Sequence, residues 1–179
     1  LTQLWQIGFT NLTGIDPFIS NDTQNNGACI YKKNLEDLGG KFQLISLHHS
    51  LEHIPQQLTT LKQVKRLLAA DGICLIRIPI VPSYVWEKYK TNWVEMDPPR
   101  HLYLHSVDSI CRCASKAGLR LIGISYDAIE LEFFGSEQYI RDIPLFDPRS
   151  LAVNPESNIF SLEEKAFFRH EVERVNREM

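Results

Sequence analysis

Two apolar stretches with an amphipathic one between them limit the folds open to this chain more than any other part of it. FQLISLH (42–48) and ICLIRIPI (73–80) are nearly continuous apolar runs, as in strands that are buried on both faces. Residues 56–70 place leucines and a valine on one helical stripe, with lysines and Arg66 on the opposite face. A strand, a helix and a strand in this order predict an α/β fold with a largely parallel sheet.

Further apolar stretches extend this pattern along the chain. Residues 11–16 and 29–31 indicate two short strands, and LRLIGISY (119–126) indicates another strand. Residues 81–105 show no such periodicity, and we expect an irregular segment there, of a length that usually serves binding or covers a site. No internal repeat interrupts the alternation of strands and helices.

Helix signals mark the second half of the chain and both of its ends. Ser106 is a good N-cap for a helix that Gly118 would end. SLEE at 161–164 is a capping box, and the helix that it starts is expected to continue to Met179. The first residues from Leu1 already have the pattern of a helix in progress. We therefore expect that the chain is cut from a longer protein at both ends.

The composition is that of an ordinary globular protein and excludes some classes of partner. Hydrophobic residues make up 44% and charged residues 23%, with a net charge of −3. This charge predicts no nucleic-acid partner, and the absence of any apolar run of about 20 residues predicts no membrane span. The four cysteines lack a CxxC spacing, which indicates reduced thiols and a cytoplasmic protein; they are Cys29, Cys74, Cys111 and Cys113. Homo-oligomerisation is left open.

Three histidines and a glutamate follow the strand predicted at 42–48 without a turn residue. His49, Glu52 and His53 match H-x-x-E-H, the inverted zinc-protease signature, and on a helix the two histidines would share a face. Pro55 arrives two residues later and leaves barely one helical turn, so we expect no metal site here. A zinc hydrolase remains the less favoured alternative.

Two other segments carry side chains suited to a site in an α/β fold. Asp16 ends a predicted strand, where an acid can bind a ribose hydroxyl of a nucleotide cofactor, although turn chemistry alone also favours aspartate there. None of the nine glycines forms the GxG pattern that should precede such an acid. DPPRHLYLH (97–105) presents Arg100 and His101 from a loop that two prolines hold rigid.

Taken together, these pieces resemble the class I S-adenosylmethionine-dependent methyltransferases of the small-molecule type, which includes ubiquinone-biosynthesis enzymes. The similar segments run in the family's order: its second strand, its adenine-edge loop with the fourth strand and LEH helix, its next helix with the fifth strand, and its substrate loop with the following helix and strand. They are GFTNLTGIDPF, NLEDLGGKFQLISLHHSLEHIPQ, LKQVKRLLAADGICLIRIP and MDPPRHLYLHSVDSICRCASKAGLRLIGIS. The family's first strand and Gly-rich loop have no counterpart.

The resemblance implies a Rossmann-like class I methyltransferase sheet with flanking helices, with the first strand missing and the C-terminal end truncated. It implies a partial methyltransferase core over 1–130 and, over 131–179, a C-terminal extension with a terminal helix that caps the substrate. The complete protein would bind S-adenosylmethionine and methylate a small-molecule or glycan-like acceptor. We expect this chain alone to bind the cofactor weakly or not at all and to be inactive, and the alternative is a non-catalytic interaction module of the same fold.

The resemblance also assigns cofactor-binding residues. Asp16 would hold the ribose, and Leu35 and Glu36 would lie in the loop at the adenine edge. His48 would lie near the sulfonium, where the fourth strand opens toward the methionine end of the cofactor. The sequence does not indicate the acceptor or the atom that is methylated.

Catalysis in such a family is mainly the alignment of donor and acceptor, with removal of a proton where the nucleophile is an oxygen or nitrogen. His101 is our first choice for the base and His49 the second. Trp86, Tyr89 and Trp93 would either line an acceptor pocket or form a core that anchors the long loop.

Overall fold

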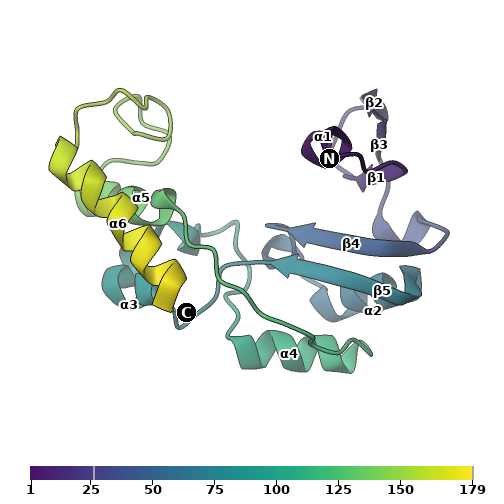
Figure 1. Cartoon of the computed structure of the whole chain (residues 1–179). Coiled ribbons are helices and arrows are strands. Elements are labelled where there is room, and N and C mark those ends of the chain that lie inside the picture. The colour runs from purple at the N-terminus through teal and green to yellow at the C-terminus, as the bar shows by residue number, and fades with distance from the viewer. Residues whose placement is uncertain (26, 179) are drawn as a thin grey trace.

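The strands lie in two separate sheets in the computed structural model, which describes residues 1–25 and 27–178 (Figure 1). The described strands are β1 (Leu12–Ile15), β2 (Thr23–Asn25), β3 (Ala28–Tyr31), β4 (Phe42–His48) and β5 (Leu68–Arg77). β3 pairs with β1 in parallel and with β2 antiparallel, while β4 and β5 form a parallel pair of their own. The mixed α/β class is confirmed. A single sheet is not formed, because no described strand pairs with both β1 and β4.

Helices occupy about half of the chain after β4. The described helices are α1 (Thr2–Gln6), α2 (Gln57–Leu67), α3 (Tyr84–Tyr89), α4 (Val107–Lys116), α5 (Glu130–Ile140) and α6 (Leu162–Glu178), with the short 3-10 helices η1 (Leu35–Asp37), η2 (Leu51–His53), η3 (Lys90–Asn92) and η4 (Val94–Met96). None of them has both the length and the apolar character that crossing a membrane requires. The expected end of the last helix at Met179 lies outside the described residues.

Helices α2 and α4 cover one face of the β4–β5 pair (Figure 1). The stripe predicted on α2 is buried, and Leu61 packs with Leu51 of η2 and Ala117 at the end of α4. Leu47 of β4 and Ile76 of β5 join this core from the sheet. The opposite face remains open among the described residues, with half of each of three apolar side chains exposed: Leu44, Ile73 and Leu75.

Strand β5 begins earlier than expected. The sequence predicted a helix to residue 70 with Asp71-Gly72 as its stop, but α2 ends at Leu67 and Leu68 is already extended and paired with Phe42. The Lys41 ammonium donates to the carbonyl oxygens of Arg66 and Leu68 at 2.6 and 3.2 Å. These bonds satisfy acceptors that the helix end leaves free, so the strand can start at once.

The segment 81–105 contains helices rather than the irregular structure that was expected. The Ser83 hydroxyl accepts from the Trp86 amide at 3.1 Å and caps the start of α3, and η3 and η4 follow directly. Tyr89 and Trp93 are buried in a second core, so this part of the chain is anchored by its aromatic side chains. Tyr89 and Trp93 therefore form a core and do not line an acceptor pocket.

This second core joins α3 to α5 and α6. Its buried members are Val85, Tyr89, Trp93, Phe133, Phe160, Phe168 and Val175. Helix α5 was not expected, whereas α6 starts at the predicted capping box: Ser161 Oγ accepts from the Glu164 amide and Glu164 accepts from the Ser161 amide, at 3.2 and 2.7 Å. The core draws on residues 85–93 as well as 133–175, and the division of the chain at residue 130 stays a prediction.

The strand predicted at 119–126 does not form. Gly118 ends α4 as expected, with φ of +80°, and the chain then runs without regular structure as far as α5 (Figure 1). Leu121, Ile122 and Ile124 are each half or more exposed. An alternating apolar pattern produces a strand only where a sheet edge accepts it, and within the described residues this segment pairs with none.

Candidate functional site

The carboxyl ends of β4 and β5 bring together a cation and two histidines. His48 and Arg77 are opposite each other in the parallel pair, and the His49 amide donates to the Arg77 carbonyl at 3.0 Å. Arg77 Nη1 contacts His49 Nε2 closely and lies 3.5 Å from His48 Nε2, while its Nε donates to Asp127 Oδ2 at 2.6 Å. A guanidinium only donates, so His49 Nε2 accepts and the proton of this ring is on Nδ1.

His49 is held as a neutral ring. Burial lowers its pKa most, the Arg77 charge lowers it further, and Glu52 only partly opposes these effects. His49 also has a φ of +45°, a strained value for a residue other than glycine, so its place is fixed by the surrounding contacts. Because its one lone pair already accepts from Arg77, His49 is poorly suited to take a proton from a substrate.

Glu52 lies at the inner end of this group of polar side chains. The residue is 1% exposed, and neither carboxylate oxygen has a hydrogen-bond partner among the described residues. Its nearest ionisable neighbour is His49, whose Nδ1 is 3.5 Å from Oε1. Buried polar groups are almost always hydrogen-bonded, since leaving one unpaired costs a few kcal/mol. Glu52 is therefore an unusual feature of the molecule.

The proline loop docks onto the 3-10 helix that carries Glu52. The Leu102 amide donates to the Glu52 carbonyl at 2.9 Å, and the Tyr103 hydroxyl donates to the Pro55 carbonyl at 3.0 Å. Asp97 turns the chain into this loop with left-handed backbone angles, φ of 36° and ψ of 52°. These bonds hold residues 97–103 against η2.

Docking of the loop fixes the tautomers of two histidines. His53 Nδ1 lies 2.9 Å from the Arg100 carbonyl oxygen, and His101 Nδ1 lies 2.6 Å from the Glu95 carbonyl oxygen. A carbonyl only accepts, so both rings are protonated on Nδ1 and, when neutral, keep the lone pair on Nε2. The ring centroids are 4.8 Å apart.

Glu52, His53 and His101 form the cluster whose side chains could hold a metal. One potential ligand atom from each residue lies within 4.8 Å of those from the other two. Glu52 and His53 belong to the H-x-x-E-H match, but the third member is His101 from the proline loop, not His49. Sequence analysis expected no metal site at the H-x-x-E-H match, and this cluster shares two residues with the match and differs in the third.

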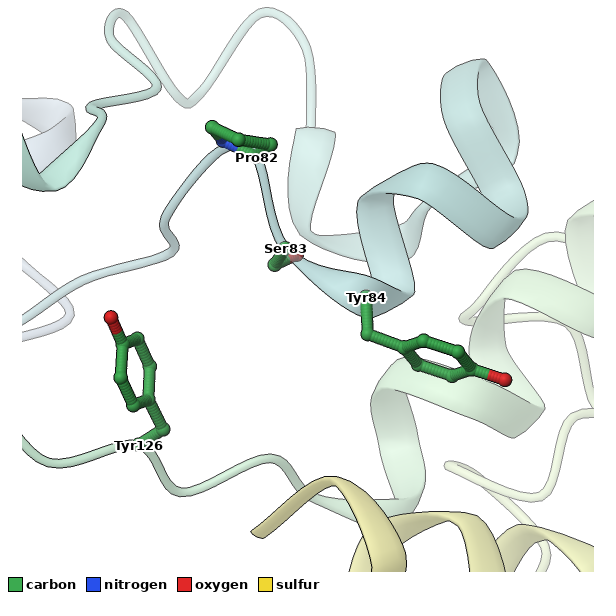
Figure 2. Close-up of a pocket in the computed structure, with 4 residues that line it drawn as sticks. All are labelled: Pro82, Ser83, Tyr84 and Tyr126. Atoms are coloured by element: carbon green, nitrogen blue, oxygen red, sulfur yellow. The ribbon is translucent and has the colours of Figure 1, made fainter. Parts of the chain in front are cut away.

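An open hollow of about 430 Å³ lies where the chain leaves β5 (Figure 2). Pro82, Ser83, Tyr84 and Tyr126 line it, and Tyr126 precedes the Asp127 that pairs with Arg77. Figure 2 shows the Tyr126 ring on the far side of the hollow from Pro82 and Ser83, and the Tyr84 ring directed away from it. The Tyr84 hydroxyl donates to Glu171 at 2.6 Å, which fixes that orientation.

The residues assigned to a cofactor by resemblance lie on separate elements. Asp16 follows β1, where its Oδ1 accepts from the Phe18 amide at 2.8 Å in a local turn and its Oδ2 has no hydrogen bond to the described residues. Leu35 and Glu36 are on η1, and His48 ends β4 in the other sheet. Their joint role in binding a cofactor stays a prediction.

Two participants in the site were missed from the sequence. Arg77 is the only charged side chain in ICLIRIPI, and a cation within an apolar strand is a signal that could have identified it. Asp127 follows a segment that was assigned to a strand, and nothing in its local sequence distinguishes it.

Comparison with known proteins gives one family. A family model described as a methyltransferase domain matches residues 1–124, which include β4, β5, η2 and the proline loop. A search of the curated proteins found no match.

Proposed function

Because the chain belongs to the methyltransferase domain family over residues 1–124, we propose that it serves S-adenosylmethionine-dependent methyl transfer to a small-molecule or glycan-like acceptor. The family match is the observation that carries this proposal. The position of the polar cluster supports it, since ligands of open α/β sheets bind beyond the carboxyl ends of the strands and His48, His49 and Arg77 lie there.

The chemistry of the side chains fits the proposed cofactor. S-adenosylmethionine, when bound, supplies an electrophilic methyl group, which leaves the protein to bind, align and manage protons. Asp16 Oδ2 is available to accept from a ribose hydroxyl, because the local turn uses only Oδ1. Leu35 and Glu36 would contact the adenine edge, and His48 would face the methionine end.

His101 is the histidine that we assign to activation of the acceptor. Its Nδ1 is fixed on the Glu95 carbonyl, so the Nε2 lone pair is directed by a rigid contact and is not used by Arg77 as that of His49 is. The loop that carries His101 is docked through Leu102 and Tyr103, which limits its freedom to lose this orientation.

We assign one part of the acceptor to the hollow beside Tyr126, from which its reacting group would extend to His101, a residue that does not line the hollow. Its lining combines the aromatic ring of Tyr126 with the hydroxyl of Ser83 and the ring of Pro82, a mixture of apolar and hydrogen-bonding groups that suits a small polar molecule such as a sugar. The hollow is open to solvent, in keeping with an acceptor that is larger than the part held.

Titration of the chain with S-adenosylmethionine by calorimetry tests this proposal. Asp16→Asn keeps an acceptor for the Phe18 amide but removes the charge, and it should weaken binding by about 1.5–3 kcal/mol, or roughly 10- to 150-fold. Asp108→Asn on the surface of α4 is the matched control and should bind as the parent chain does. Equal binding by both variants removes Asp16 from the site. Because this chain alone is expected to bind weakly, the same titration is repeated on a chain extended upstream of Leu1, and no binding by that longer chain favours the non-catalytic alternative.

A further inference from the structure

The buried carboxylate of Glu52 lacks a partner that would explain its position. At 1% exposure, with both oxygens free of hydrogen bonds to the described residues, an ionised Glu52 bears the full cost of leaving water. His49 does not supply the missing positive charge, because its Nε2 accepts from the Arg77 guanidinium and the ring is therefore neutral. A cation from solution would supply it.

Two imidazoles beside Glu52 are hydrogen-bonded in the way that is typical of metal-binding histidines. Each donates its Nδ1 hydrogen to a backbone carbonyl, His53 to Arg100 and His101 to Glu95, and each keeps Nε2 for another partner. Metal-binding histidines almost always use the second nitrogen in this way, since it fixes both the tautomer and the direction of the ring. Two histidines on segments far apart in sequence share the feature here.

We propose that Glu52, His53 and His101 together bind one divalent transition-metal ion, of which Zn²⁺ is the representative. Two imidazoles and one carboxylate form a ligand set that zinc accepts with a fourth position open, whereas Mg²⁺ and Ca²⁺ favour oxygen ligands. This inference rests on the site of the proposed function but not on its reaction.

Binding requires a modest closure of the cluster. Ligand atoms on a tetrahedral zinc ion stand about 3.4 Å apart, given bonds of 2.0–2.1 Å, whereas those of the three side chains lie within 4.8 Å of one another. Small changes in the side-chain torsions of the two histidines and Glu52 would have to bring the ligand atoms to this spacing. Asp97 Oδ2 is 4.0 Å from His101 Nε2, too far for a hydrogen bond to the ring, and is placed to accept from a water on the bound ion.

A bound cation changes the role of His101 in the proposed reaction. As a ligand His101 no longer takes the proton of the acceptor itself. It would hold the ion, and a hydroxyl group of the acceptor at the open position would lose its proton to solvent water more readily, because the ion stabilises the deprotonated form. The aligned methyl donor is unaffected by this change.

The test is metal binding to the whole chain, with activity left aside. Chelator-treated protein is titrated with Zn²⁺ by calorimetry, and with Co²⁺ by visible spectroscopy. We expect calorimetry to give one ion per chain. The Co²⁺ spectrum should be that of an ion with four or five ligands and should lack thiolate charge-transfer bands. The melting temperature should be higher with the ion bound than without it. Glu52→Gln and His101→Ala should each weaken binding at least ~10-fold and abolish the thermal shift. His170→Ala, which removes an exposed histidine of α6, should bind as the parent chain does.

The outcomes separate this proposal from competing ones. Less than one ion per chain, or equal binding by the parent, Glu52→Gln and His101→Ala, overturns the site, and thiolate bands would assign the ion to the cysteines instead. Melting curves of the metal-free variants confirm that each is folded before it is titrated. S-adenosylmethionine binding measured on metal-free protein reports on the proposed function alone, so either proposal can fail without the other.

Discussion

Among single residues, two partly buried glutamates have raised pKa values. Burial raises the pKa of Glu95 and raises that of Glu132 to about 7, and the Glu95 charge adds to the effect on Glu132. The hydrogen bond that Glu132 accepts from the Ile129 amide, at 3.4 Å, opposes this rise but does not cancel it. Glu132 therefore exchanges its proton near neutral pH, far from the range of an ordinary carboxyl group.

Glu132→Gln should stabilise the fold at alkaline pH and have little effect at acidic pH. The folded pKa lies above the unfolded value of 4.5, so the stability that Glu132 contributes is present below pH 4.5 and is lost as the pH rises through about 7. At pH 8 the fold then contains a partly buried charge that glutamine lacks, and the variant should gain up to about 3 kcal/mol. Urea unfolding at pH 5 and pH 8 measures this. Glu130→Gln, at an exposed position on the same helical turn, should leave the free energy of unfolding unchanged at both pH values. If Glu132→Gln stabilised the fold equally at pH 5 and pH 8, the raised pKa of Glu132 would be contradicted.

The sequence identified most of the site's residues but not their partners. Sequence analysis singled out His49, Glu52, His53 and His101, because the identity of ionisable side chains can be read directly from the sequence. Their pairing depends on the Leu102–Glu52 backbone bond, which brings the proline loop onto η2. Burial of Glu52 follows from that docking, and no local pattern encodes it.

Among the elements, the helices with polar caps follow the sequence most closely. Ser106 Oγ accepts from the Ser109 amide at 3.1 Å, and Ser109 Oγ accepts in return from the Ser106 amide at 3.0 Å. Gly118 provides the positive φ at the other end of α4. Such signals are local and were predictable.

Ser106→Ala should destabilise the chain by about 1 kcal/mol, the usual cost of an N-cap that loses its side-chain acceptor. Ser115→Ala, at an exposed position of the same helix, should change the free energy of unfolding by less than half as much. Both are measured by urea unfolding at one pH. If the two variants were equally stable, the capping bond would contribute nothing to α4.

The elements that were mispredicted depend on distant partners. Residues 119–126 have the alternation of a strand, but their backbone finds no described sheet edge, so the segment remains extended and exposed. Helix α5 begins after Ile129, which has no polar cap, and its buried Phe133 and Gly135 are weak helix formers. Packing against Val94 and α6 stabilises this helix, and the sequence of the helix alone does not predict that packing.

At the scale of the whole molecule, the residues that the structure describes form two hydrophobic cores rather than one. One joins η2, α2 and α4 to the β4–β5 pair, and the other joins α3, α5 and α6 through aromatic side chains. Separate cores are expected to open with separate free energies, because disruption of the packing in one core does not expose the other to water.

Phe133→Ala tests this independence. Phe133 is fully buried among the aromatic side chains of the second core, and its truncation should cost about 3–5 kcal/mol. Hydrogen exchange should accelerate in α5 and α6 while the amides of β4 and β5 keep their protection. Phe146→Ala, at a position that is 77% exposed, is the control and should leave both regions unchanged. Equal acceleration in both regions would mean that the chain unfolds as one unit.

The ion pair between Arg77 and Asp127 couples the buried carboxylate of Glu52 electrostatically to the solvent. The Asp127 side chain is 66% exposed, and from it Arg77, His49 and Glu52 follow in contact toward the interior. Dissolved ions screen charges at the surface over about 8 Å at physiological ionic strength but act little on charges in the low-dielectric interior. A rise in salt concentration weakens the electrostatic attraction between Asp127 and Arg77. The Asp127 charge then offsets less of the positive potential that Arg77 produces at His49. The ionic strength of the surroundings can thus alter the electrostatic potential at Glu52 without any ion entering the protein.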